Sequence, residues 1–257
     1  MRWLPLAALA VSITTTLSAQ SSTEPINTDR PDFTESSTLV PLHRLQFESG
    51  YSWTEAKANA GGGGSATFPE LLIRYGLSNR LEFRVGQSFT RVSPPAGQGS
   101  GITGRDDLYL GLKIGLGAQR GGQPALALLA HTSLPTGDSK TSASGTYPGL
   151  AILAGWDLSP DWSLDTGIEA NRVSGDAWEI APSLSLGRTI SARVKGYAEI
   201  YSLLPVLAES GAGNSHYVNG GLAFLITDNF QLDARVGAGL SDRADRYFFG
   251  FGFAIRR

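Results

Sequence analysis

The chain has 257 residues, a net charge of −2, three histidines and no cysteine. The near-neutral charge balance gives no indication of binding to nucleic acid or to an anionic lipid surface. The lack of cysteine excludes a small disulfide-stapled domain, so core packing or closure of a sheet on itself must hold the fold.

The N-terminus has the pattern of a secretory signal peptide. Arg2 precedes an apolar run over residues 3–13, and the small residues Ser18 and Ala19 offer a cleavage site before Gln20. The alternative is an uncleaved anchor helix, but the run contains Pro5 and is much shorter than the ~20 apolar residues that span a bilayer. We therefore expect residues 1–19 to be a signal peptide.

The segment after it, residues 20–43, is not a typical membrane strand. Pro31 removes a backbone donor, and the charges between Asp29 and Glu35 do not alternate with large apolar groups. Two interpretations stay open for this segment: a plug inside a lumen, or an extended periplasmic tail. Because the residue before a proline favours an extended conformation, Arg30 would be able to pair with a lumen carboxylate. The charged plug candidates are Asp29, Arg30 and Asp32.

Residues 44–257 contain a series of alternating segments. Large apolar residues recur at every second position and polar residues lie between them, which is typical of strands with one apolar face. Neither an amphipathic helix period nor a long apolar helix is found after the signal. The segments of about ten residues suit tilted strands that cross a bilayer. We place twelve of them, near residues 45–54, 70–77, 81–89, 107–116, 126–133, 150–156, 162–171, 178–186, 193–201, 218–226, 230–240 and 247–256.

The last segment, YFFGFGFAIRR, carries Phe249, Phe251 and Phe253 on one face and Gly250 and Gly252 on the other. It is expected to pair with the first segment and so to remove both edges of the sheet. Barrel-assembly machinery typically recognises an aromatic, glycine-containing last strand, and many such strands end on phenylalanine. This chain ends on two arginines instead.

The connections between segments support a membrane barrel. Those after even-numbered segments are mostly short, as in residues 78–80, 159–161 and 227–229, and those after odd-numbered segments are often long. Short periplasmic turns and long extracellular loops are typical of outer-membrane barrels. We expect an all-β, antiparallel up-and-down transmembrane barrel of about twelve strands, in the outer membrane of a Gram-negative bacterium, with both termini periplasmic.

A secreted β-sandwich is the alternative fold, because it also has short alternating strands. The apolar faces carry almost no charge, however, and aromatic residues recur near segment ends, as interfacial girdles require. The expected girdle residues are Trp53, Tyr75, Trp156, Trp162 and Tyr247.

Residues 28–36 (TDRPDFTES), followed by Val40-Pro41 and by LQFESGY at 45–51, resemble the opening signature of the MetA-pathway of phenol degradation family. Residues 134–138 (LPTGD) are similar to a second signature of that family. The resemblance implies an outer-membrane barrel for uptake of small, often aromatic, molecules, and it brings no catalytic or binding residues with it.

Twelve strands predict a lumen between the filled interior of eight-stranded barrels and the open channel of large porins. The expected inner wall carries both signs of charge, so strong anion selectivity is not predicted. Much of this charge is expected to pair between neighbouring strands, and tyrosines are able to stack on aromatic solutes. The candidate lumen-lining residues are Glu48, Glu70, Arg74, Glu82, Arg84, Tyr109, Lys113, His131, Arg193, Lys195, Tyr197, Glu199, Asp233 and Arg235.

We therefore expect a channel for passive uptake of small, possibly aromatic, solutes, without a cofactor or metal. Its expected partners are outer-membrane lipid, the assembly machinery and an unidentified solute. A structural or adhesive barrel with a closed lumen is the alternative. A barrel hydrolase is less supported, because only His131 of the three histidines sits on a strand near hydroxyls, and Ser133 lies about 7 Å along the same face.

Overall fold

The computed structural model describes residues 24–58, 62–95, 98–143, 145–206 and 213–257. The expected signal peptide lies outside the described residues. Within them, no helix is long and apolar enough to cross a membrane.

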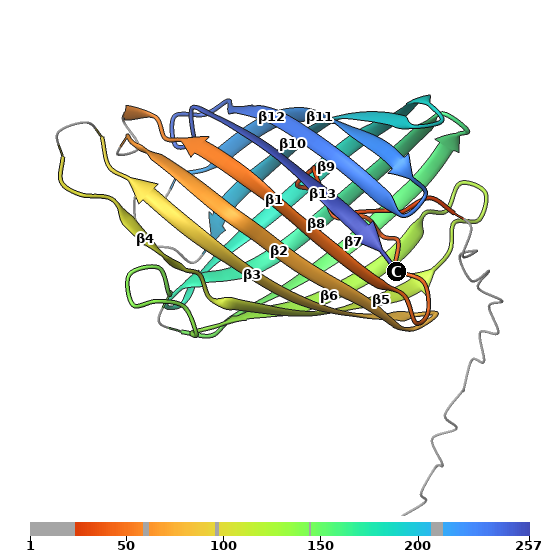
Figure 1. Cartoon of the computed structure of the whole chain (residues 1–257), viewed down its shortest axis with the longest axis horizontal. Coiled ribbons are helices and arrows are strands. Elements are labelled where there is room, and N and C mark those ends of the chain that lie inside the picture. The colour runs from red at the N-terminus through yellow and green to blue at the C-terminus, as the bar shows by residue number, and fades with distance from the viewer. Residues whose placement is uncertain (1–23, 59–61, 96–97, 144, 207–212) are drawn as a thin grey trace, which may run out of the picture.

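The described chain consists almost entirely of strands joined by turns and loops (Figure 1). The strands are β1 (Leu45–Glu55), β2 (Gly64–Ser78), β3 (Leu81–Ser93), β4 (Ile102–Arg105), β5 (Leu108–Gly117), β6 (Ala125–Leu134), β7 (Tyr147–Ser159), β8 (Trp162–Ser174), β9 (Ala177–Ser191), β10 (Val194–Val206), β11 (Ser215–Thr227), β12 (Phe230–Gly239) and β13 (Tyr247–Arg256).

The sheet closes on itself. Strand β1 pairs antiparallel with both β2 and β13, and each later strand pairs with its neighbours in the chain. The exception is β4, which pairs only with β3 at the loop end, so that β3 continues the barrel by pairing with β5. Twelve strands thus form a closed antiparallel barrel, which confirms the predicted fold. The connection after β3, one of the long ones that follow odd-numbered segments, contains the short β4, which is not among the twelve predicted segments.

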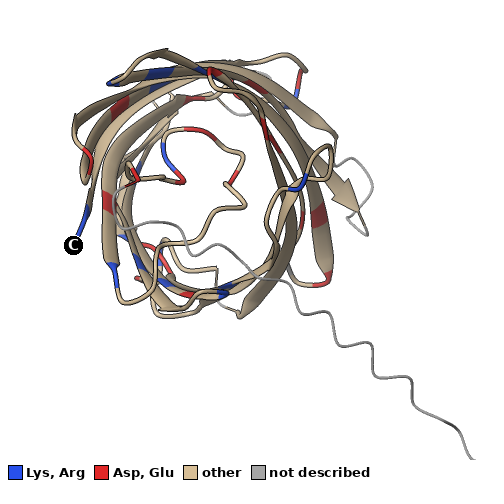
Figure 2. Ribbon diagram, turned by 90° about the vertical axis from the view of Figure 1, so that its right-hand side faces the viewer, with Lys and Arg blue, Asp and Glu red and all other residues tan. Residues whose placement is uncertain are grey.

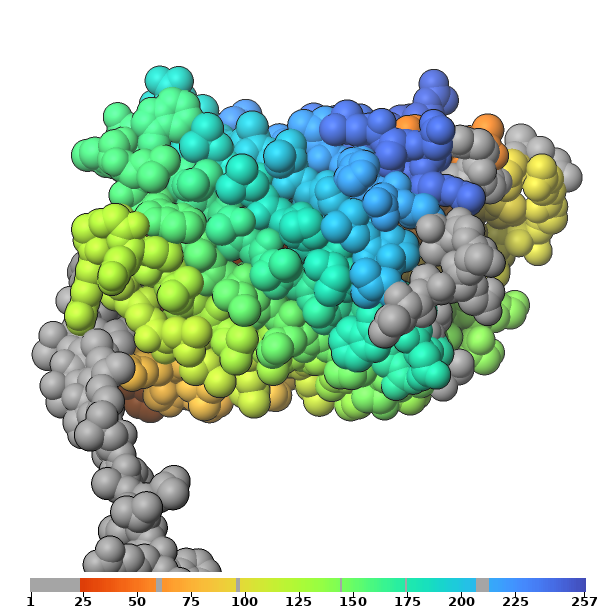
Figure 3. Space-filling model, turned by 180° about the vertical axis from the view of Figure 1, so that it is seen from behind, coloured from red at the N-terminus to blue at the C-terminus, as the bar shows by residue number. Residues whose placement is uncertain are grey.

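Alternation along each strand separates the two faces of the wall. On β13 the aromatic side chains at every second position from Tyr247 to Phe253 lie on the outer face, where Phe251 is 56% exposed. The residues between them face the lumen. Figure 3 shows the opposite wall, coloured from yellow-green to light blue, as one continuous outer surface. A band of exposed large apolar side chains is what a lipid-facing wall requires.

The two rims of the barrel differ in their connections. Turns of two residues at 79–80, 160–161, 192–193 and 228–229 lie at one rim, which we call the turn end. Most connections at the other rim, the loop end, are longer, although residues 175–176 form a short turn there. Strand β1 begins and β13 ends at the turn end (Figure 1). The expected girdle aromatics lie near the rims, with Tyr75, Trp156 and Trp162 at the turn end and Trp53 and Tyr247 at the loop end.

The arginine at position 256 is not a free cation at the rim. Its Nε donates to Asn229 Oδ1 at 2.9 Å, and its second guanidinium nitrogen donates to the carbonyl of Glu24 at 2.6 Å. Arg256 therefore ties the last strand both to the β11–β12 turn and to the start of the N-terminal segment.

Candidate functional site within the lumen

We call residues 24–43 the plug segment. Most of it lies inside the ring of strands (Figure 2), and residues 24–25 and 42–43 at its two ends are exposed. The segment has bends but no regular secondary structure, and its hydrogen bonds run mostly to the inner wall. Its carboxylates, guanidinium and backbone groups contact strands on several sides of the lumen. Charged strand residues that would otherwise face water are therefore buried beneath it.

Asp29 is the acidic centre of the plug segment. Its carboxylate lies 3.1 Å from Arg74 and 3.3 Å from Lys113, and it also pairs with Arg84. Those three cations are almost completely buried, so each needs anionic partners to offset its loss of hydration. Glu48 and Glu82 supply further anionic partners, and the carboxyl of Glu35 lies 2.7 Å from Arg84.

Arg30 lies over the seam where β1 meets β13. It pairs with Glu70 of β2 at 2.7 Å and with Asp233 of β12 at 3.3 Å, and so bridges the strands that flank the seam. Beneath it, Gly50 and Gly252 are register partners, and a Cβ added to either would lie within 2.7 Å of the guanidinium group. The two glycines therefore leave the space that Arg30 fills.

The other side of the plug segment docks on β10. Glu199 accepts the backbone N–H groups of Phe33 at 2.9 Å and Thr34 at 2.5 Å. The ring of Phe33 stacks on Tyr201, with 4.1 Å between ring centroids. Next to it, Ser185 donates to Asp32 at 3.2 Å. An apolar patch of β6 and β7, made of Ala127, Leu129, Ala151 and Leu153, packs against Leu39.

Burial changes the acidity of the plug carboxyls. Desolvation raises the pKa of Asp32 well above its ordinary value, and Glu199 adds repulsion. Desolvation also raises the pKa of Glu35 to about 7, against the opposing pull of Lys113. Burial alone would lower the pKa of Arg30, but Asp233 and Glu70 outweigh that effect and raise it. The segment therefore holds two carboxyls that take up protons more readily than usual and one firmly charged guanidinium.

Most of the candidate lumen residues lie on the inner face. The ring of Tyr109 lies beside that of His131, tilted by 31° with 5.3 Å between the centroids, and Lys195 and Tyr197 line a cavity. The prediction that Arg193 lines the lumen is wrong. Arg193 lies in the exposed turn between β9 and β10, because the alternating sequence pattern extends to one residue before the first residue of β10. The candidate lumen residues that form hydrogen bonds with the plug segment are Glu48, Glu70, Arg74, Glu82, Arg84, Lys113, Glu199, Asp233 and Arg235.

Uncharged wall residues also hold the plug segment, and the sequence reasoning missed them. Gln46 donates to the carbonyl of Asn27 at 2.8 Å, and Gln231 donates to Thr28 Oγ1 at 2.8 Å. Gln46 in β1 and Gln231 in β12 both occupy positions of the alternating pattern that face inward. That pattern is the feature of the sequence that could have identified them.

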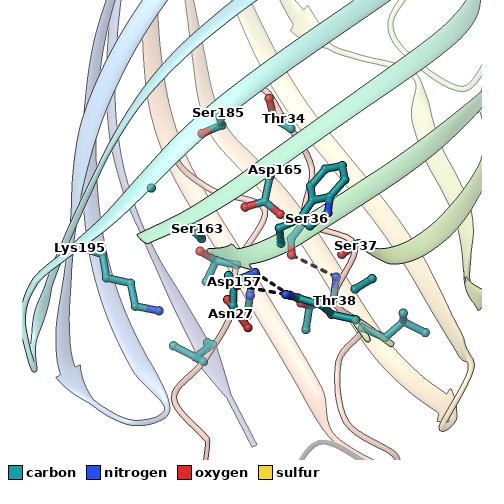
Figure 4. A pocket seen from close by; sticks show the side chains of 18 of the residues that line it. Asn27, Thr34, Ser36, Ser37, Thr38, Asp157, Ser163, Asp165, Ser185 and Lys195 are labelled. Carbon is teal, nitrogen blue, oxygen red and sulfur yellow. Dashed lines mark hydrogen bonds between the residues drawn. The ribbon is translucent and has the colours of Figure 1, made fainter. Parts of the chain in front are cut away.

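A cavity of about 800 Å³ lies between the plug segment and the wall at the turn end. It runs from Asn79 and Asp161 in the turns to Arg30 and Tyr197 deeper in the barrel. Figure 4 shows Lys195 on one side and Ser163 and Asp165 across from it. A second cavity of about 270 Å³ lies between β2, β3 and β5, beside Tyr109.

The histidines do not assemble a hydrolase site in the described part of the chain. His131 Nε2 lies 2.7 Å from Glu169, and no hydroxyl there bonds to its ring. The histidine with a hydroxyl partner is His216, whose Nδ1 lies 2.8 Å from Ser202, which corrects the expectation that only His131 sits near hydroxyls. No carboxylate among the described residues orients that ring, as nucleophile activation requires. Nor do the described residues include a group of three or more His, Asp or Glu placed to hold a metal ion.

The sequence profile of the family described as "Putative MetA-pathway of phenol degradation" matches residues 28–256. The chain belongs to this family. The match covers both the plug segment from Thr28 and the whole barrel, so the two are parts of one family unit. A comparison with curated protein sequences finds no match.

Solved structures similar to this family member are outer-membrane barrels. The COG4313 outer membrane channel from Pseudomonas putida F1 has a TM-score of 0.66 at 14% identity, covering 90% of this chain and 100% of that chain. The KdgM porin has a TM-score of 0.53 at 9% identity, covering 82% and 98%. The translocator domain of the autotransporter NalP from Neisseria meningitidis has a TM-score of 0.56 at 12% identity, covering 85% and 90%. At these identities the likeness establishes the fold, which channels, porins and translocators share.

Proposed function

We propose that this family member is an outer-membrane channel for passive uptake of small solutes, and that its plug segment restricts the lumen. The observation that carries the proposal is the cavity of about 800 Å³ that enters a twelve-stranded barrel between the plug segment and the wall. The similarity in fold between this chain and outer-membrane channels and porins also supports a channel function.

A solute would move along the side of the lumen where the cavity lies. The plug segment is bound to β2, β3 and β5 through Asp29 and Glu35 and to β10 through Phe33 and Thr34. We infer that larger solutes pass only when these contacts open. Passage then needs no energy source, because the hydrogen bonds, ion pairs, ring stacking and apolar packing that hold the plug segment are all reversible.

Small aromatic solutes are the class that we propose. Tyr197 lines the cavity and Tyr109 the second one, and aromatic rings at such positions stack on aromatic ligands. The family description, with its reference to phenol degradation, points the same way. The wall carries both signs of charge, so we expect weak selectivity between anions and cations.

We further propose that the turn end faces the periplasm. The start of β1 and the end of β13 then both lie on the periplasmic side. Short periplasmic turns are the rule in outer-membrane barrels. Outer-membrane lipid is then the partner of the apolar outer face, and barrel-assembly machinery that of the chain during insertion. After cleavage at residue 19, the plug segment would enter the lumen from the periplasmic side.

The competing reading is a structural or adhesive barrel with a closed lumen, favoured by the many contacts of the plug segment. A liposome-swelling assay separates the two. Vesicles that contain the refolded protein should swell in phenol, more slowly in short carboxylic acids and least in disaccharides. Equal rates with and without the protein for every solute would support the closed barrel. A hydrolase is our least favoured alternative, because His131 bonds to Glu169 and to no hydroxyl, and no carboxylate among the described residues orients the ring of His216 beside Ser202.

A further inference from the structure

The place occupied by Arg30 has the features of a binding site for a cation. We define the Arg30 seat by the glycine pair Gly50 and Gly252, which form its floor, and by the carboxylates of Glu70 and Asp233 at its sides. A floor without side chains and two flanking carboxylates suit a flat group with several N–H donors, since guanidinium pairs with carboxylates through parallel hydrogen bonds.

Arg30 fits this seat incompletely. Its Nε is buried and has no hydrogen-bond partner, and Asp233 Oδ2 is likewise buried without one. The Asp233 side chain is 0% exposed, so water cannot easily satisfy that oxygen. The contact that Arg30 does make with Asp233 is long, at 3.3 Å. A donor and an acceptor without partners therefore lie in one site.

The seat can be reached from the cavity. Arg30 is among the residues that line the cavity at the turn end, and its side chain keeps 13% exposure. Glu70 keeps 23% but is not among the residues that line this cavity. A small molecule that enters the cavity thus meets Arg30, the occupant of the seat, while the plug segment is still in place.

We propose that the Arg30 seat is a binding site for small solutes that carry a guanidinium group, and that Arg30 occupies it as a competitor built into the chain. A free guanidinium is not tied to a backbone, so it can turn to use both oxygens of Asp233. Such a solute displaces Arg30 and loosens the plug segment from the seam. Solutes with a guanidinium group would then be a second class that the channel takes up. This role in uptake rests on the proposed channel function.

The test uses the full chain with Arg30→Ala, refolded in detergent. Millimolar methylguanidinium should raise the thermal stability of this variant in a saturable way, because the emptied seat holds two underpaired carboxylates. Urea and methylammonium serve as uncharged and as non-planar probes. The matched control is the same variant with Glu70→Gln and Asp233→Asn added, which should show no rescue. In planar bilayers, agmatine should block current through Arg30→Ala saturably and should not block the control.

Rescue and block confined to the intact seat support the proposal. Absence of rescue by methylguanidinium, equal rescue by methylammonium, or equal rescue of the control overturns it. The stability arm needs no conduction, so a barrel that never conducts argues against the channel while leaving the seat testable. A barrel that conducts without any guanidinium effect argues against the seat alone.

Discussion

Gly50 of β1 and Gly252 of β13 face each other across the seam that closes the barrel, and the guanidinium of Arg30 lies against both. The last strand therefore has two roles. Its phenylalanines form part of the outer surface, and its glycines leave room inside for the plug segment. Closure of the sheet and docking of the plug segment are coupled at this place.

Substitution of Gly50 by alanine should expel Arg30 from its seat. The added Cβ would lie 2.2 Å from a guanidinium nitrogen, and its nearest neighbours all belong to Arg30, so the strand itself can stay in place. Loss of charge-assisted hydrogen bonds predicts a destabilisation of about 1–3 kcal/mol in urea unfolding. Gly117→Ala is the control, since nothing lies within 4 Å of its Cβ. Equal midpoints for the two variants would contradict the seam contact.

The raised pKa of Glu35 predicts a pH-dependent stability. The carboxyl moves from an ordinary pKa of 4.5 to about 7 in the folded protein, so between these values the folded state holds a proton that the unfolded state has lost. Stability therefore falls as pH rises through this window and stays lower above it. The surrounding charges act in both directions, with Arg74, Arg84 and Lys113 favouring the carboxylate and Glu82 and Glu169 opposing it.

Thermal unfolding of wild type and Glu35→Gln across pH 4 to 9 measures this effect. The difference between the two proteins cancels the titration of all other groups. Wild type should lose stability relative to the variant as pH rises toward about 7, because only wild type then carries a partly buried charge at this position. A constant difference over that range would show that Glu35 does not titrate there.

The outward position of Phe251 predicts a strong effect of charge. Phe251 lies near the middle of β13 and is 56% exposed on the apolar face. Arginine at the centre of a lipid-facing strand costs about 2–4 kcal/mol, so Phe251→Arg should lower stability in phospholipid vesicles by that amount. Phe251→Leu should change it little. If both variants matched wild type, the outer face would not be in lipid.

The two C-terminal arginines should differ sharply. Arg256 is 4% exposed and bonds to Asn229 and to the carbonyl of Glu24, whereas Arg257 is exposed. Arg256→Ala should destabilise the barrel by about 1–3 kcal/mol, since hydrogen bonds to a charged group are lost. Arg257→Ala should have no measurable effect. Circular dichroism during thermal unfolding in detergent compares them, and the reverse order would refute this account of the chain end.

Alternation was enough to predict the barrel, because the period of side chains along a strand is a local property. The phenylalanines of β13 are visible in the sequence, and the closed sheet then follows from strand number and the lack of charge on one face. The same rule misplaced Arg193, since an alternating pattern does not show where a strand gives way to a turn.

Docking of the plug segment depends on register, which the sequence does not display. The pairing of Gly50 with Gly252 and the place of Arg30 above them appear only when β1 and β13 are aligned. The Ser202–His216 contact also joins residues of two strands through their register. The wall carries many carboxylates and cations. The partner that each plug residue contacts among them also depends on how the strands are aligned.

Single-channel conductance of the refolded protein in planar bilayers tests the central claim most directly. Asp29 is shared by Arg74, Arg84 and Lys113, so Asp29→Asn should weaken the hold of the wall on the plug segment. We predict small, infrequent current steps for wild type and larger, more frequent steps for Asp29→Asn. Asp176→Asn, at an exposed loop-end turn, should behave like wild type. Flat traces for all three proteins at every salt concentration would contradict a channel controlled by its plug segment.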